Sequence, residues 1–172
     1  MPMHNAYTKY LGDSDPVAVM AATPGTLYRV FSTLLSTAAG QDTVNTPAEP
    51  GKWSPREVLS HLADCEIAFG FRLRQALADP NNVIQPFDQD QWARHYAPYD
   101  APSALATFAT LRNWNMLLIN GLQPQDWDAP VTHPERGTGT FRDLVALIAG
   151  HDLNHLQRIT QLAPPPPPYG TA

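Results

Sequence analysis

Apolar residues recur at helical spacing in four segments of the chain, and no segment shows the strict alternation that is typical of a half-buried strand. In the third segment, for example, the apolar stripe consists of Leu105, Phe108, Leu111, Leu118 and Leu122. The four predicted helices cover residues 24–39, 55–78, 101–120 and 141–162. The pattern therefore predicts an all-α protein.

Residues that favour helix ends support these boundaries. Ser54 precedes Pro55, which suits the first position of a helix, and Glu57 completes a capping box with Ser54. Asp100 or Ser103 is expected to cap the third helix. Thr140, followed three residues later by Asp143, is expected to cap the fourth. We expect Gly40 to end the first helix and Gly121 to end the third.

The connection between the second and third helices, residues 80–100, is long enough to cross the whole bundle. We therefore expect these two helices to run parallel in a four-helix bundle with a long crossover. The connection contains four aromatic residues, Phe87, Trp92, Tyr96 and Tyr99. We expect them to anchor the crossover over the bundle rather than to bind substrate.

Composition narrows the classes of protein that fit. The length of 172 residues predicts one domain, here residues 1–163, followed by a proline-rich tail over 164–172. The net charge of −5, without a basic stripe, argues against a nucleic-acid partner and against a polybasic membrane anchor. We find no signal-peptide pattern and no apolar stretch that is long enough for a bilayer, and we expect a soluble cytoplasmic protein.

Histidine residues occupy positions where the helical pattern calls for apolar side chains. His151 and His155 lie on the apolar stripe of the fourth helix, spaced so that both project into the bundle side by side. His61 lies on the inner stripe of the second helix. Buried imidazoles need polar partners, and a divalent metal ion is a suitable one. Three histidines leave a fourth coordination position open, as in catalytic sites.

Other residues near these histidines have two interpretations each. Cys65 lies one helical turn after His61; it could be a fourth ligand, but we favour a small apolar core residue. Asp64 is either an acceptor that orients His61 or a solvated carboxylate. Arginines on the helices either bind an anionic group of a substrate or pair at the surface; these are Arg72, Arg74 and Arg112. The remaining histidines, which we expect at the surface, are His4, His95 and His133.

These residues resemble the DinB-like superfamily of metal-dependent proteins, which includes the YfiT-type members. The resemblance extends from Thr23 to Leu162. It rests on the segments 51–66, 90–93, 133–137 and 151–159 and on the helix that contains Arg112. It implies a four-helix bundle with a long crossover between helices two and three. It also implies a homodimer and a metal site formed by His61, His151 and His155.

The resemblance leaves the reaction open. Some members are implicated in thiol-dependent S-transfer with low-molecular-weight thiols, and such a transfer is the first functional hypothesis. It requires a small-molecule substrate and a divalent cation, for which we expect zinc or nickel. Metal coordination would hold the thiol as a thiolate. The second hypothesis is metal-dependent hydrolysis, for which no general base is evident because Asp152 should point away from the histidine stripe. The third is a non-enzymatic, dimeric metal-binding or stress-related protein. A fourth is a bundle that packs its histidines without metal.

Overall fold

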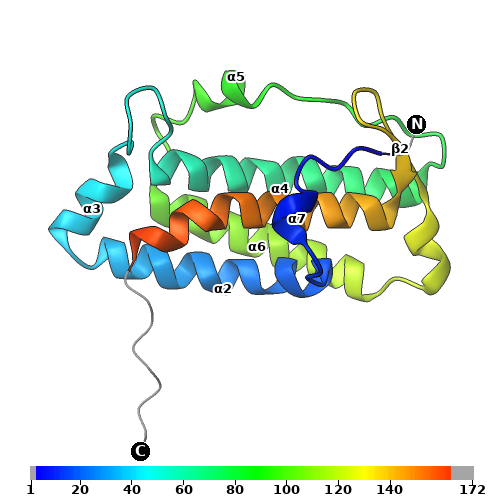
Figure 1. The fold of residues 1–172 in the computed structure, drawn as a ribbon, viewed down its shortest axis with the longest axis horizontal. Helices are drawn as coiled ribbons and strands as arrows, with labels where there is room; N and C mark the ends of the chain where they lie inside the picture. The colour runs from blue at the N-terminus through cyan, green and yellow to red at the C-terminus, as the bar shows by residue number, and fades with distance from the viewer. Residues whose placement is uncertain (1–2, 164–172) are drawn as a thin grey trace, which may run out of the picture.

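The computed structural model describes residues 3–163, and four long helices form its body (Figure 1). They are α2 (Pro16–Leu35), α4 (Pro55–Ala78), α6 (Ala101–Asn120) and α7 (Phe141–Ile159). The shorter elements are α1 (Thr8–Leu11), α3 (Ala38–Asn45), α5 (Gln89–Ala93), η1 (Pro124–Asp128), β1 (Pro130–His133), β2 (Gly137–Thr140) and η2 (Thr160–Leu162). The predicted four-helix bundle is confirmed. The proline-rich tail lies outside the described residues, and the domain boundary at 163 stays a prediction.

The crossover sets the direction of the helices. In Figure 1, α4 and α6 run in the same direction, while α2 and α7 run in the opposite one. The segment that joins α4 to α6 returns along the outer side of α4 and carries α5. The predicted parallel arrangement of the second and third long helices is therefore confirmed.

Capping chemistry fixes the ends of α4 and α6 at the predicted residues. At the start of α4, the Ser54 N–H donates to Glu57 Oε2 over 2.7 Å, and the Glu57 N–H donates to Ser54 Oγ over 3.3 Å. At the start of α6, the Ser103 N–H donates to Asp100 Oδ1 over 2.7 Å. Both helices begin where side chains satisfy their free N–H groups.

The first predicted helix was wrong at both ends. Helix α2 begins at Pro16, eight residues before the predicted start, and ends at Leu35; Gly40 lies inside the separate helix α3. Helix α2 tolerates Pro24 in its interior because another residue donates the hydrogen bond that the proline nitrogen cannot donate. The carbonyl of Met20, which would accept from residue 24, instead accepts a 2.9 Å hydrogen bond from Arg112 Nη1.

A two-stranded antiparallel sheet, which the sequence pattern did not predict, joins η1 to α7. Val131 and His133 point inward from β1 and are buried. The Ile84 N–H donates to the Thr132 carbonyl over 2.8 Å, so the β1–β2 hairpin is tied to the crossover. The bond to the crossover holds this hairpin in place at one end of the bundle.

The core stripe of α6 also differs from the prediction. Phe108 is buried as predicted and Leu118 packs against the core, but Leu111 is only half-buried. The inward face also carries four residues outside the predicted stripe: Arg112, Asn115, Met116 and Ile119. A fully buried arginine and an asparagine thus occupy the middle of an otherwise apolar stripe. Within residues 3–163, no helix has the length and hydrophobicity needed to cross a membrane.

Candidate metal centre

Three histidine rings from two helices meet in the middle of the bundle. The ring centroid of His61 on α4 lies 5.3 Å from that of His151 and 5.1 Å from that of His155, and the two α7 rings are 4.6 Å apart. The Nε2 atoms of His61 and His151 are separated by 3.2 Å. The structure therefore brings together the three residues predicted to bind metal, while their role as ligands stays a prediction.

Burial keeps the three imidazoles uncharged. His61 and His151 are 1% and 4% exposed, and His155 is half-buried. Burial lowers the pKa of His61 to about 3 and that of His155 to about 4. The pKa of His151 is lowered well below its ordinary value by burial first and by its two histidine neighbours next. At neutral pH all three rings offer a lone pair, which is the form that binds a metal ion.

The polar atoms of the cluster fit a cation. Because the Nε2 atoms of His61 and His151 face each other at 3.2 Å, at most one of them can carry a proton. Within the described residues, Nδ1 of His151 is buried without a hydrogen-bond partner. A cation between the rings would accept both lone pairs, and His/Cys sets of this kind suit zinc and other borderline metals.

Cys65 is a second candidate ligand. Its Sγ lies 3.5 Å from Nε2 of His61, and ligand atoms of His61, Cys65 and His151 all lie within 4.8 Å of one another. Within the described residues this group does not include His155, whose ring lies beside it, so the ligand distances favour two histidines with a thiolate and the ring positions leave three histidines as the other donor set. Burial raises the pKa of the Cys65 thiol, so coordination by Cys65 would require removing its proton, whereas the neutral ring of His155 already offers a lone pair. Cys65 also packs with Phe69 in the core, as predicted for a small apolar residue.

Aromatic side chains form the walls around the rings. Trp53 packs against His61 with centroids 5.0 Å apart, and Phe69 packs edge-on against His151 at 5.6 Å. Tyr7, just before α1, also packs edge-on against His151, at 5.4 Å. This contact depends on Gly150, because a Cβ there would lie 2.8 Å from that of Tyr7. The segment around α1 therefore covers one side of the cluster.

A buried charge network lies beside the histidines, around Asp152 on α7. Arg112 donates to both carboxylate oxygens of Asp152, over 2.6 and 3.1 Å, and to Glu66 Oε1 over 2.7 Å. Thr23 and Asn115 donate to the same two carboxylates. Burial alone would lower the pKa of Arg112, but the two carboxylates raise it, so the guanidinium stays charged. The network carries one net negative charge next to the histidines.

This network corrects the interpretation of Arg112. The sequence offered it as an anion-binding or surface residue, yet its side chain is fully buried and occupied by Asp152 and Glu66. Asp152 points away from the histidine stripe, as predicted. Glu66 was not recognised as a partner. Its spacing on α4, one turn after Leu62 and one before Gly70, already places it on the face towards α6.

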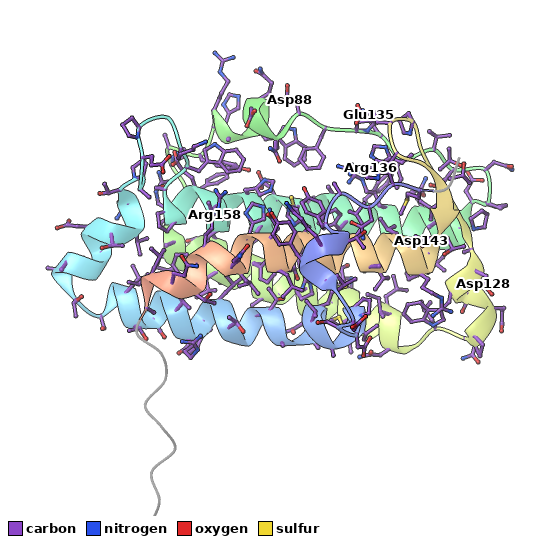
Figure 2. The ribbon with its side chains drawn as sticks, viewed as in Figure 1. Asp88, Asp128, Glu135, Arg136, Asp143 and Arg158 are labelled. Carbon is purple, nitrogen blue, oxygen red and sulfur yellow. The ribbon has the colours of Figure 1, made fainter. Side chains whose placement is uncertain are left out.

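Two cavities open on either side of the histidines. The smaller, about 300 Å³, is lined by His61, Cys65 and His151 together with residues of the crossover and the hairpin. The larger, a groove of about 1150 Å³, is lined by His155, Trp53 and Arg158 together with the loop after α3. Arg158 lies on α7 at the groove side, away from Arg136 at the hairpin (Figure 2). The cluster can therefore be reached from two directions.

The structure also places the other residues for which the sequence made a prediction. His133 was expected at the surface but is buried at the end of β1 and lines the smaller cavity. Asp64 lies beside the Tyr96 hydroxyl and makes no hydrogen bond to His61 among the described residues. His4 and His95 are exposed, as expected.

The aromatic residues of the crossover differ in how deeply they are buried. Tyr96 is buried and anchors the loop, while Phe87 lines the smaller cavity.

Comparison with known proteins gives a consistent result. A sequence model described as the DinB superfamily matches residues 26–159. A protein of Oceanobacillus iheyensis called a putative metal-dependent hydrolase is 32% identical over 121 residues, which cover 69% of this chain and 70% of that protein. One of Bacillus mycoides with the same description is 28% identical over 125 residues, 71% of each chain. The solved structure of YfiT from Bacillus subtilis, described as a probable metal-dependent hydrolase with an unusual four-helix bundle topology, matches with a TM-score of 0.74 at 24% identity, covering 86% of this chain and 83% of its own.

Proposed function

This chain belongs to the DinB superfamily, and from its histidine cluster we propose that it is a divalent-metal-dependent enzyme that activates a small nucleophile. The observation that carries the proposal is the meeting of three uncharged imidazoles, with two Nε2 atoms 3.2 Å apart, between two cavities. We propose His61, His151 and His155 as the ligands and zinc or nickel as the metal, since imidazole suits both.

The cation would supply one kind of chemistry, lowering the pKa of a water molecule or a thiol that binds to it. The chain's own residues do the rest. The three imidazoles would hold the cation without releasing protons. The aromatic walls of Trp53, Phe69 and Tyr7 exclude bulk water from the rings. The net negative charge of the network around Arg112 favours a cation nearby.

Hydrolysis is the first candidate reaction. The relatives from Oceanobacillus iheyensis and Bacillus mycoides are both described as putative metal-dependent hydrolases, and water needs no pocket of its own. The two buried carboxylates nearest the histidines in sequence, Glu66 and Asp152, are both bound by Arg112 and are not free to act as general bases. Another carboxylate would be needed instead; the one that lines the smaller cavity among the described residues is Glu135, whose side chain is exposed at the outer edge of the hairpin (Figure 2).

Transfer to a low-molecular-weight thiol is the second candidate. The specific observation in its favour is the presence of two cavities beside the cluster, a small one lined by His61 and His151 and a large one lined by His155. A reaction between two organic molecules needs two binding sites, whereas hydrolysis needs one. The cation itself would keep the thiol deprotonated, so no protein base is required.

Metal removal tests the proposal and separates the candidates. Protein prepared without a histidine tag is expected to contain about one zinc or nickel ion per chain, the stoichiometry of a single site. Chelation should abolish turnover of an ester, amide and epoxide panel, and reloading should restore it. Turnover without added thiol indicates hydrolysis; turnover only with thiol indicates transfer. Metal binding without turnover under either condition would favour a metal-binding protein, and no metal binding would contradict the proposal.

We also propose a homodimer. Ile67 and Phe71 on α4 and Trp114 and Leu117 on the neighbouring α6 are all more than half exposed. Exposed apolar side chains that gather on adjacent helices are typical of an interface. Light scattering is expected to give twice the chain mass of 18.9 kDa, and Phe71→Glu with Trp114→Glu should give the single mass. A wild-type monomer at micromolar concentration would contradict this proposal.

A further inference from the structure

The smaller cavity contains a second cluster of polar residues, which the metal proposal does not use. Arg72 from α4 and His133 and Arg136 from the β1–β2 hairpin line the same cavity as His61 and His151. Arg72 lies about three helical turns, about 16 Å of helix axis, after His61. These residues are therefore placed to contact a part of the substrate that is remote from the histidines.

The two arginines lack a carboxylate partner. Among the described residues, the side chain of Arg72 donates one hydrogen bond, to the Gln85 carbonyl over 2.8 Å, and Arg136 forms no ion pair. Glu135 is the only acidic residue that lines the cavity within this part of the chain, and its side chain is exposed. In Figure 2, Glu135 lies at the outer edge of the hairpin, whereas Arg136 lies between the hairpin and α4. The cavity thus keeps an excess of positive charge.

The charges of the two arginines are close enough to affect each other. Burial lowers the pKa of Arg72; Cys65 partly opposes this shift, and Arg136 lowers the pKa further. Burial and the two arginines lower the pKa of His133, which keeps that ring neutral. Like charges that share a half-buried cavity are unfavourable unless an anion neutralises them. An anionic ligand that binds here would therefore relieve the repulsion between the two arginines.

The donors are held in fixed positions. The guanidinium of Arg72 stacks over Phe87 and Phe69, with its carbon 5.3 and 5.9 Å from the ring centroids. Nδ1 of His133 accepts a 3.2 Å hydrogen bond from the Glu135 N–H, so the proton of the neutral ring is on Nε2, which is a donor. Planar guanidinium groups bind carboxylate and phosphate oxygens through two parallel hydrogen bonds.

We propose that Arg72, Arg136 and His133 form an oxyanion subsite that binds a carboxylate or phosphate group of the substrate while its reacting end lies at the histidines. The proposal rests on the proposed function for the role of the histidines. It adds the substrate class: a small molecule with a terminal oxyanion, of a size that fits a cavity of about 300 Å³. The two arginines would select against neutral analogues, whose binding would leave their charges unpaired.

Titration calorimetry with acetate and with inorganic phosphate, at constant ionic strength, tests the subsite. The full-length chain is measured both with its metal and after chelation. Binding of at least one anion is expected in both forms, and the tighter of the two identifies the oxyanion. Arg72→Gln and Arg136→Gln should each weaken binding about tenfold or more, the loss of one charge-assisted contact. Arg72→Lys should fall between, because it keeps the charge and loses the paired geometry.

Arg94→Gln is the matched control, since Arg94 is exposed on the crossover and its side chain, among the described residues, bonds to Gln91 alone. It should leave anion binding unchanged, and all variants should keep the wild-type metal content and unfolding temperature. Equal binding in wild type and in the Arg72→Gln/Arg136→Gln double variant would overturn the proposal. Anion binding that disappears on chelation would also overturn it, because the anion would then be bound by the cation. A chain that binds the anion through the arginines but binds no metal would refute the proposed function alone.

Discussion

Replacing His151 by alanine is expected to reduce the metal content from about one ion per chain to a small fraction of that, and to abolish the metal-dependent activity. A bound zinc ion is worth about 10–16 kcal/mol in sites with four protein ligands, so one ligand accounts for roughly 3 kcal/mol, about 100-fold in affinity. His151 is chosen because it belongs to both possible donor sets and its Nε2 faces that of His61 at 3.2 Å. Elemental analysis after gel filtration measures the effect directly.

Parallel variants identify the donor set. His61→Ala and His155→Ala should lose metal as His151→Ala does, whereas Cys65→Ala should keep it. His95→Ala is the control, because His95 is exposed on the crossover. Cobalt-loaded wild-type protein should lack the near-ultraviolet charge-transfer band of a thiolate ligand. Metal loss in Cys65→Ala together with retention in His155→Ala would replace the three-histidine site by the set of His61, Cys65 and His151.

Arg112→Met is expected to lower the free energy of unfolding by about 3–5 kcal/mol, the usual loss when one partner of a buried ion pair is removed. The substitution leaves the carboxylates of Glu66 and Asp152, each 1% exposed, without their cation. It also leaves the Met20 carbonyl beside Pro24 without a donor. Urea unfolding, followed by circular dichroism at pH 7, measures the change.

Neutralising the partners should restore part of this loss. The triple variant Arg112→Met, Glu66→Gln, Asp152→Asn is expected to be more stable than Arg112→Met alone, because no unpaired charge remains buried. Arg94→Met serves as a surface control and should change stability by less than about 0.5 kcal/mol. If Arg112→Met cost no more than the control, the buried network would not contribute as its geometry indicates.

The sequence predicted the parts of the fold that local chemistry decides. The bounds of α4 and α6 follow from caps and prolines within a few residues of each helix end, so they could be read directly. The start of α2 could not, because Pro24 is tolerated only through a donor that comes from Arg112 on another helix. The strands β1 and β2 are short and are held by contacts with the crossover, which no alternation in their own residues reveals.

The residues of the candidate site likewise fall into those that the sequence predicts and those that it does not. His61, His151 and His155 stood out because histidines interrupt an apolar stripe, a signal contained within each helix. Arg112 and His133 were misplaced because their burial depends on long-range partners. The two carboxylates of Arg112 are on other helices, and His133 is buried by the packing of its hairpin against the crossover. A charge on an apolar stripe, at helical spacing from Phe108 and Met116, was the one signal that could have identified Arg112.

The contact between Tyr7 and Gly150 has a consequence for kinetics. Helix α1 has four residues, none of them buried, yet the segment that carries it covers the ring of His151. Segments with so little buried surface open far more often than the bundle unfolds. Opening of this short segment would give chelators a further route to the cation besides the two cavities, so exchange should remain rapid under conditions where the core amides are protected from hydrogen exchange. Binding of the cation would then stabilise the folded core, while the cation itself would exchange as rapidly as a surface group.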